Sequence, residues 1–234
     1  MSSAPVDLAG LVSQSRVLLF DVEGTTTPID FVTKELFPFA RVRMESFLAE
    51  NAKELAADLE ALKREFLGEP LAPFAEYAPL PYLLWLMDRD RKSPALKSIQ
   101  GKIWEGGYRS GALKGAVYPE VRSAFERWKD EGKRLFIYSS GSVLAQKLLF
   151  GYSSAGDMLP LLEGHFDTGV GAKREAGSYR EIARRVGTEE KGITFFSDIV
   201  AELDAAREAG MGTVLVCRSG KVENNGHPWV SDFQ

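Results

Sequence analysis

Acidic and hydroxyl side chains stand directly after predicted strands of this sequence. Asp21 and Glu23 follow the strand-like run "RVLLF" and precede a glycine and three threonines. Comparable positions are held further along the chain by Ser139, Ser140 and Asp198, with Lys173 in a loop ahead of a predicted helix. Carboxylates are ligands for a divalent cation such as Mg²⁺, and phosphate binds hydroxyl, N–H and ammonium donors. The residue types therefore predict a site for a phosphate ester and a divalent cation.

The elements that must position these residues alternate along the second half of the chain. Strands are predicted over residues 16–21, 133–140, 164–170, 192–198 and 213–217, and helices over 119–132, 142–151, 178–187 and 200–210. Such alternation predicts an α/β fold with a Rossmann-like parallel sheet and helices on both faces. Ligands bind beyond the carboxyl ends of the strands in such a sheet. The candidate residues should therefore meet at one edge.

A helical segment interrupts this alternation after the first strand. Between residues 34 and 68 leucine and phenylalanine recur at helical spacing, and a proline-rich stretch and two further helical patterns follow. We therefore expect a helical cap domain over residues 30–115, inserted into a catalytic core of residues 1–29 and 116–234. Caps of this type exclude water and contact substrate. The segment "IQGKIWEGGYRSGALKG", with its glycines and polar side chains, is expected to face the site.

Composition narrows the class of protein. Hydrophobic residues make up 44% and charged residues 26% of the 234 residues, and the net charge is −4. This balance argues against nucleic-acid and anionic-membrane partners, which need a basic surface. The chain has no apolar run of ~18 residues, no secretory signal pattern and one cysteine, Cys217. We expect a cytoplasmic monomer. With two histidines in the chain, acid–base chemistry should fall to carboxylates or lysine.

Four short motifs carry a resemblance to a known superfamily. "DVEGTT", "YSSGS", the lysine of "AKREAGSY" and "FFSD" resemble, in order, the motifs of the haloacid dehalogenase-like phosphatases, most of which have Asp-x-Asp in the first motif. With "IQGKIW" and "GHFDTGVGAK" the sequence resembles, from Arg16 to about Arg218, the narrower family of enolase-phosphatases (acireductone synthases) of methionine salvage. One departure is the missing proline beside Lys173.

The resemblance implies a role for each candidate residue. Asp21 would be the nucleophile that forms an aspartyl-phosphate, and Glu23 would transfer protons. One Mg²⁺ per subunit would be held by Asp21, Asp198 and the backbone carbonyl of Glu23. Phosphate would be bound by Ser139, Ser140 and Lys173. The substrate implied is 2,3-diketo-5-methylthiopentyl 1-phosphate, converted to acireductone and phosphate by enolisation and hydrolysis.

Other interpretations of the same residues remain open. The chain could hydrolyse another small phosphate ester, or be a non-catalytic binding module on this fold. Asp198 could be the N-cap of the next helix, and Ser139 and Ser140 could cap the helix that follows them. Lys173 alone would be a solvated surface lysine. Glu202 could support the water shell of the metal or lie on a solvated helix face.

Overall fold

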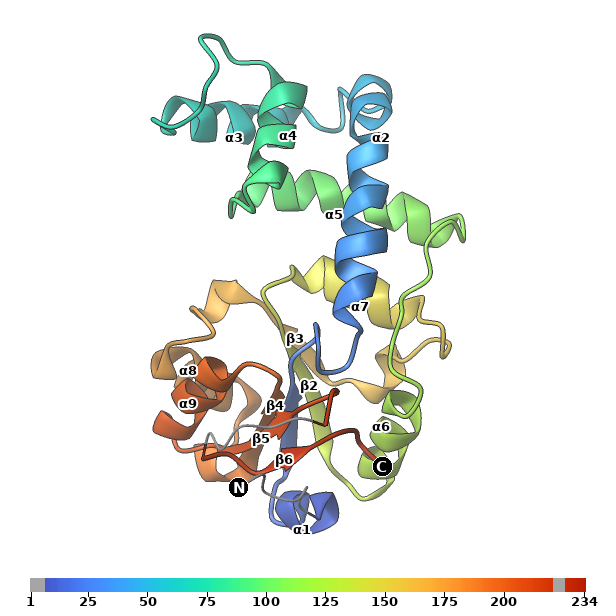
Figure 1. The fold of residues 1–234 in the computed structure, drawn as a ribbon, viewed down its shortest axis with the longest axis vertical. Helices are drawn as coiled ribbons and strands as arrows, with labels where there is room; N and C mark the ends of the chain where they lie inside the picture. Colours follow the sequence, from blue (N-terminus) through green and yellow to red (C-terminus); the bar gives the residue numbers. More distant parts are fainter. Residues whose placement is uncertain (1–6, 221–225) are drawn as a thin grey trace. The chain divides into compact units, whose positions relative to one another are not determined.

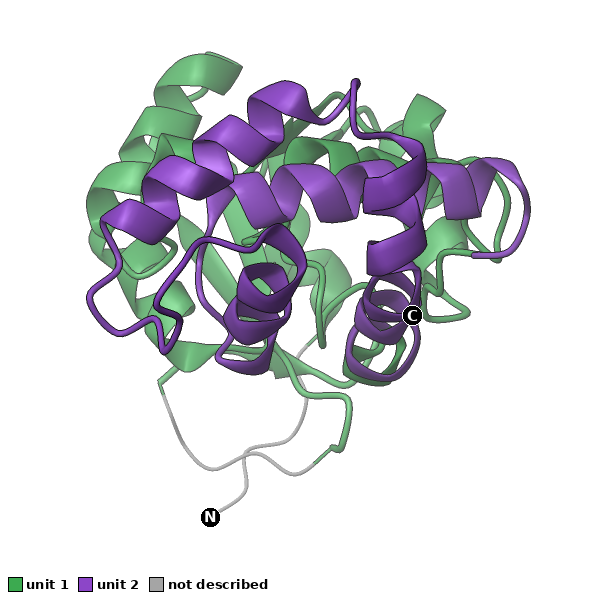
Figure 2. Cartoon of the chain, turned by 90° about the horizontal axis from the view of Figure 1, so that it is seen from above, with its two compact units in different colours: residues 1–31, 114–234 green, residues 32–113 purple. Residues whose placement is uncertain are grey.

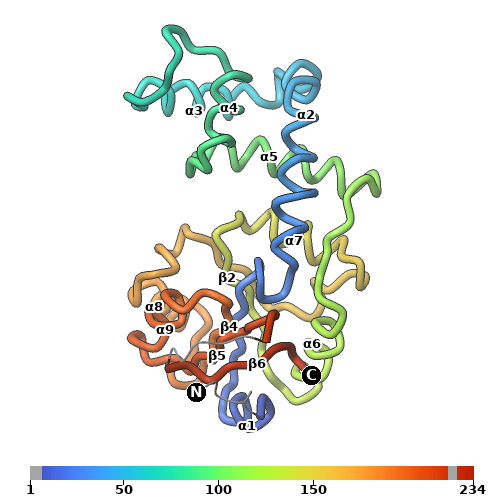
Figure 3. The backbone as a smooth tube through the Cα atoms, in the orientation of Figure 1, coloured from blue at the N-terminus to red at the C-terminus, as the bar shows by residue number. Residues whose placement is uncertain are grey.

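The contacts of the chain divide it into two compact units. The structure, a computed structural model, describes residues 7–220 and 226–234. Unit 1 comprises residues 1–31 and 114–234, and unit 2 comprises residues 32–113, as coloured in Figure 2. The expected boundaries, after residues 29 and 115, lie close to these. The chain leaves unit 1 after its first strand and returns ahead of α6, a path that can be followed in Figure 3.

A parallel β-sheet forms the centre of unit 1 (Figure 1). Among the described residues it has six strands in the order β3-β2-β1-β4-β5-β6. Their bounds are Val17–Phe20 (β1), Arg134–Tyr138 (β2), Gly164–Phe166 (β3), Ile193–Ser197 (β4), Gly212–Val216 (β5) and Trp229–Val230 (β6). Each neighbouring pair is parallel. The predicted α/β class is therefore confirmed, and β6 is an edge strand that the sequence pattern did not reveal.

Helices cover both faces of this sheet. Those of unit 1 are α1 (Leu8–Val12), α6 (Val121–Asp130), α7 (Val143–Gly151), α8 (Ala176–Val186) and α9 (Val200–Glu208). On one face α8 and α9 pack on a core that includes Leu19 and Phe195. On the other face Trp128 of α6 stacks on Phe20 at 5.4 Å and lies 5.9 Å from Phe196, measured between ring centroids. Alternate residues of β1 and β4 thus fill two cores.

The register of the central strands fixes where the candidate residues lie. Phe20 of β1 is aligned with Ile137 of β2 and with Phe196 of β4. The residues that follow these three therefore reach the same edge of the sheet. This edge is the carboxyl end, where a parallel sheet binds its ligands.

Unit 2 is helical. It contains α2 (Phe37–Glu50), α3 (Ala56–Leu67), α4 (Pro79–Asp88) and α5 (Pro94–Arg109), with a π-helical turn at Phe31–Leu36 leading into α2. The helical pattern expected from residue 34 to 68 is broken by a turn at residues 51–55. Within the unit the Trp104 indole donates a hydrogen bond to the Leu36 carbonyl at 2.9 Å, and Lys102 pairs with Asp58 at 2.6 Å. These contacts hold α5 against the turn ahead of α2 and against α3.

Two adjacent glycines of α5 should respond oppositely to the same substitution. A Cβ on Gly106 would meet nothing within 4 Å, whereas a Cβ on Gly107 would lie 2.5 Å from the Phe39 ring and 2.9 Å from Leu113. Gly106→Ala should stabilise the protein by roughly 0.5–1 kcal/mol, because alanine is the better helix former. Gly107→Ala should destabilise it by about 1–3 kcal/mol through overpacking. Urea unfolding of both variants measures the difference, and equal shifts would contradict the packing described for α5.

Candidate active site

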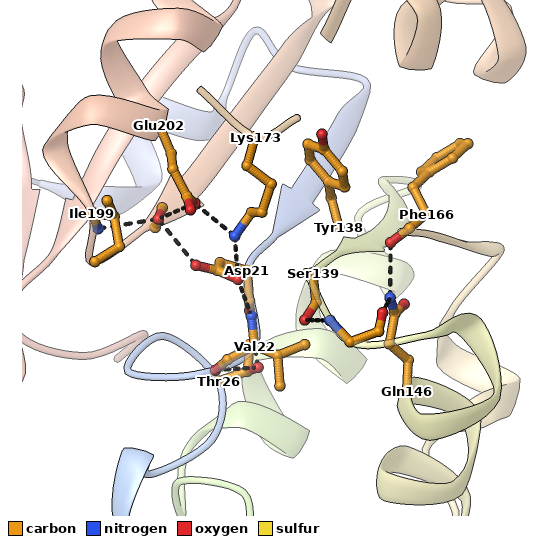
Figure 4. A network of polar contacts seen from close by, with 12 residues as sticks. Asp21, Val22, Thr26, Tyr138, Ser139, Gln146, Phe166, Lys173, Ile199 and Glu202 are labelled. Atoms are coloured by element: carbon orange, nitrogen blue, oxygen red, sulfur yellow. Dashed lines mark hydrogen bonds and ion pairs between the residues drawn. The ribbon is translucent and has the colours of Figure 1, made fainter. Parts of the chain in front are cut away.

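Asp21 is the centre of a buried polar network at the carboxyl edge of the sheet (Figure 4). It follows β1, and its backbone N–H donates to the Phe196 carbonyl at 2.9 Å. Its side chain is 4% exposed. Oδ1 accepts the Val22 N–H at 2.7 Å and lies 2.6 Å from the Lys173 ammonium, while Oδ2 accepts the Ser197 hydroxyl at 3.1 Å. The strand thus presents a carboxylate whose two oxygens have fixed partners.

Lys173 is buried rather than solvated. Its side chain is 8% exposed, and Nζ lies 2.6 Å from both Asp21 Oδ1 and Glu202 Oε2. Burial acts to lower the pKa of Lys173, but the charges of Asp21 and Glu202 outweigh it and the pKa is raised. The surface-lysine interpretation is therefore wrong, and Lys173 is a cation at neutral pH.

Glu202 belongs to the same network. The sequence interpretations were support of a metal water shell or a solvated helix face, and neither included a contact with Lys173. It lies in the first turn of α9, pairs with Lys173 and accepts the Ser197 hydroxyl at 3.1 Å. Burial and repulsion from Asp21 raise its pKa to about 7 despite the attraction of Lys173. One sequence signal could have found Glu202. It lies in the first turn of the predicted helix over residues 200–210, four residues after the strand-end carboxylate Asp198.

Asp198 follows β4 but does not cap α9. The N-cap of α9 is Ile199, whose N–H is accepted by the Ser197 hydroxyl at 3.1 Å. Within the described part of the chain, Oδ1 of Asp198 is buried without a hydrogen-bond partner. Burial and the nearby Asp21 raise the pKa of Asp198 to about 6. The helix-cap interpretation is wrong, and an unsatisfied buried oxygen calls for another explanation.

Glu23 lies in the loop that connects β1 with the turn of residues 24–27. The Thr26 hydroxyl donates to the Asp21 carbonyl at 3.0 Å, and Gly24 donates its N–H to Thr27 at 2.8 Å. Gly24 adopts φ +74°, and a Cβ there would lie 2.2 Å from the Asp198 carboxylate. Burial, with repulsion from Asp21, raises the pKa of Glu23 to about 7. Both protonation states of Glu23 are therefore accessible near neutral pH.

The two serines after β2 differ from each other. Ser139 is buried, and its hydroxyl accepts the Gly141 N–H at 3.0 Å, whereas Ser140 is exposed. Neither caps α7, because Ser142 is the N-cap and accepts the Ala145 N–H at 3.2 Å. The capping interpretation of Ser139 and Ser140 is therefore wrong. The loop is also held by Gln146, whose amide donates to the Gly141 carbonyl at 2.9 Å.

The two histidines make contacts outside the Asp21 network. His165 lies 3.2 Å from the Gln146 side-chain oxygen, and His227 lies 2.8 Å from the Thr213 hydroxyl.

Across residues 7–220 and 226–234, no three histidine, cysteine or acidic side chains gather as a metal centre. Over the same residues, no helix is long and apolar enough to span a membrane.

Comparison with known proteins shows that the chain is a hydrolase of the haloacid dehalogenase-like class. Residues 16–210 match the family model of the haloacid dehalogenase-like hydrolases. The fold is also that of a 2-haloacid dehalogenase from Pseudomonas syringae, with a TM-score of 0.60 at 16% identity over 94% of this chain and 95% of that chain. The predicted hydrolase fold is confirmed.

Relatives of higher identity identify the narrower family. Enolase-phosphatase E1 of Synechococcus elongatus is 52% identical over 87% of this chain and 89% of its own, and that of Serratia proteamaculans is 48% identical over 93% and 95%. The UTR4 protein of Saccharomyces cerevisiae, a solved structure, is 33% identical with a TM-score of 0.78 over 94% of this chain and 99% of that chain. The chain belongs to the enolase-phosphatase E1 family of these hydrolases.

The N-cap assignment next to Ser139 can be tested by stability. Ser142→Ala should lower the free energy of unfolding by about 1 kcal/mol, because it removes the cap of α7. Ser142→Asp should retain wild-type stability, since a carboxylate also caps a helix and interacts favourably with its dipole. Urea unfolding compares the two, and equal loss in both variants would show that the hydroxyl contact is not a cap.

Proposed function

We propose that this protein converts 2,3-diketo-5-methylthiopentyl 1-phosphate to acireductone and phosphate, the reaction of methionine salvage. The observation that carries the proposal is the contact of the buried Lys173 ammonium with the Asp21 carboxylate at 2.6 Å. It joins a nucleophile that follows β1 with a phosphate-binding cation from the loop ahead of α8. Membership of the enolase-phosphatase E1 family supports the choice of substrate.

Lys173, Ser139 and Ser140 would bind the phosphate group. A carboxylate that approaches a phosphate oxyanion at 4 Å is repelled by roughly 4 kcal/mol per charge pair at an effective dielectric constant near 20. The Lys173 charge offsets part of this repulsion. The hydroxyl of exposed Ser140 and the backbone N–H groups of the loop can orient phosphoryl oxygens, while Ser139 shapes the loop through Gly141.

Asp21 would attack phosphorus and form an aspartyl-phosphate. Its carboxylate is held by Val22 and Ser197 as well as by Lys173. These contacts leave the side chain little rotational freedom before the reaction, and such preorganisation lowers the barrier to attack. Water then hydrolyses the acyl phosphate and regenerates the carboxylate.

Glu23 would perform the proton transfers. Forming an acireductone requires removal of a proton from the carbon that bears the phosphate, which lies one bond beyond the ester oxygen. The extra methylene of glutamate over aspartate gives about 1.5 Å more reach. A pKa raised to about 7 suits a group that accepts the carbon proton, protonates the leaving oxygen and later deprotonates water.

The acidic residues fit a Mg²⁺ ion. The buried, unpartnered Oδ1 of Asp198 and the raised pKa of this carboxyl indicate a charge that protein groups do not neutralise. Asp21, Asp198 and the Glu23 carbonyl supply hard oxygen ligands, and Mg²⁺ keeps several waters besides. When bound, the ion would stabilise negative charge on the phosphoryl group.

We propose that the partner of this protein is a small phosphorylated diketone and that it binds neither nucleic acid nor membranes. We further propose a cytoplasmic monomer with one Mg²⁺ per chain.

Two isosteric variants should separate enolisation from hydrolysis. Asp21→Asn should release no phosphate yet still accumulate an enol phosphate, because the nucleophile acts only in the second step. Glu23→Gln should do neither. Solvent deuterium exchange at the phosphate-bearing carbon and free phosphate are measured together, with simple phosphate esters as comparison substrates. Undiminished exchange in Glu23→Gln would point to another base, and hydrolysis of simple esters in preference to the diketone would favour a different substrate.

The metal assignment predicts that the effect of Asp198→Asn on the melting temperature depends on whether Mg²⁺ is present. Without Mg²⁺, Asp198→Asn should raise the melting temperature, because it removes a buried carboxylate that Asp21 repels. With millimolar Mg²⁺, wild type should gain stability by mass action, and Asp198→Asn should gain little. Asp130→Asn, which changes the same charge at the exposed end of α6, is the control. A wild-type response to Mg²⁺ in Asp198→Asn would remove this residue from the ligand set.

A further inference from the structure

The backbone carbonyls of residues 171–173 each accept a hydrogen bond from a buried hydroxyl. The pairs are Tyr138 with Gly171 at 3.0 Å, Ser178 with Ala172 at 2.7 Å and Tyr179 with Lys173 at 2.7 Å. The two tyrosines are 0% exposed and the serine 2%. We call Tyr138, Ser178 and Tyr179 the hydroxyl clamp. Since a buried donor left unpaired is costly, these contacts hold three successive residues in one conformation.

The clamped segment has few other means of holding its shape. It lies between a 3-10 turn that ends at Val170 and the start of α8 at Ala176, outside any strand. Its backbone makes two turn contacts, from the Gly171 N–H to the Thr168 carbonyl at 3.2 Å and from the Glu175 N–H to the Ala172 carbonyl at 3.1 Å, and neither involves the backbone of Lys173. Gly171 adopts φ +132°, and a Cβ there would lie 2.2 Å from the Ser178 hydroxyl oxygen. Lys173 is followed by Arg174, so no proline restricts the backbone at this point.

The clamp also touches the other end of the lysine. The Lys173 ammonium lies 5.8 Å from the centre of the Tyr138 ring and 5.9 Å from that of Phe195. Tyr179 packs edge-on against Tyr138 at 5.5 Å and lies 5.2 Å from Phe195. Tyr138 therefore contacts Lys173 at both ends: its hydroxyl binds the backbone ahead of Lys173, and its ring lies beside the Lys173 ammonium.

We propose that the hydroxyl clamp is a set of positioning residues that holds Lys173 at the reacting phosphate. The inference rests on the role proposed above for Lys173 in phosphate binding. Asp21 holds the ammonium before the reaction, but its carboxylate changes once it is phosphorylated. The clamp does not change during the reaction, so it keeps the lysine backbone in place through both chemical steps.

Tyr179→Phe tests this most directly, because it keeps the ring and removes only the hydroxyl. Loss of one buried hydrogen bond that orients a charged group should lower kcat/KM about 5- to 10-fold. The inhibition constant for inorganic phosphate should rise by a similar factor. Ser178→Ala and Tyr138→Phe should show the same pattern. Ser15→Ala is the control. The buried Ser15 hydroxyl bonds the hydroxyl of Thr194, the second residue of β4, at 2.6 Å. Its loss should lower stability without changing phosphate affinity.

A double-mutant cycle with Lys173→Met shows whether the clamp acts through the lysine. Tyr179→Phe should have little further effect on phosphate inhibition in the Lys173→Met background, because the group that it positions is gone. Labelling by acetic anhydride with mass spectrometry gives a second measurement: Lys173 should be acetylated faster in Tyr179→Phe than in wild type or Ser15→Ala.

The outcomes separate the inference from the function on which it rests. Wild-type activity in Lys173→Met would overturn both the role of Lys173 and the clamp. A strong loss in Lys173→Met, with wild-type kinetics and labelling in Tyr179→Phe, would overturn the clamp alone. The clamp alone would also be overturned if the effects of Tyr179→Phe and Lys173→Met multiplied, or if Ser15→Ala weakened phosphate inhibition equally.

Discussion

The ion pair between Lys173 and Asp21 is the interaction on which the site depends. Both side chains are almost fully buried, and charges removed from water are stable only when they are paired and hydrogen-bonded. Asp21 is delivered by the central strand, whereas Lys173 comes from an irregular loop. The fold must therefore bring a loop to a strand end with an accuracy that a hydrogen bond requires. This explains why so many neutral hydroxyls and backbone groups surround the pair.

The sequence predicted the parts of this arrangement that follow from strand order. Apolar runs ending in Asp21, Ser139 and Asp198 mark strand ends, and parallel topology brings such ends to one edge. It could not predict that Lys173 is buried, because "AKREAG" is a polar string and the burial comes from Glu202 and two aromatic rings. Strands and helices as short as β6 and α1 carry no measurable periodicity.

Helix caps show a second limit of the sequence. Three serines between residues 139 and 142 can each cap a helix, and only backbone conformation selects Ser142. At α9 the residue types favoured Asp198, but Ser197 accepts the N–H near the helix start instead. The consequence bears on the proposed metal site, because a carboxylate used as a cap would be satisfied by backbone groups. Asp198 keeps an oxygen available, and the serine before it performs the structural task.

Ser197 also links the charges of the two acids that flank Lys173. Its hydroxyl lies 3.1 Å from oxygens of both Asp21 and Glu202 and has one proton to donate. When Asp21 is a free carboxylate, donation to it would stabilise the proposed nucleophile. If Asp21 carries a phosphoryl group, as the proposed reaction requires, donation to Glu202 would stabilise the acid that then holds the lysine. In that reaction the hydroxyl proton would follow the negative charge from one acid to the other without any movement of the backbone.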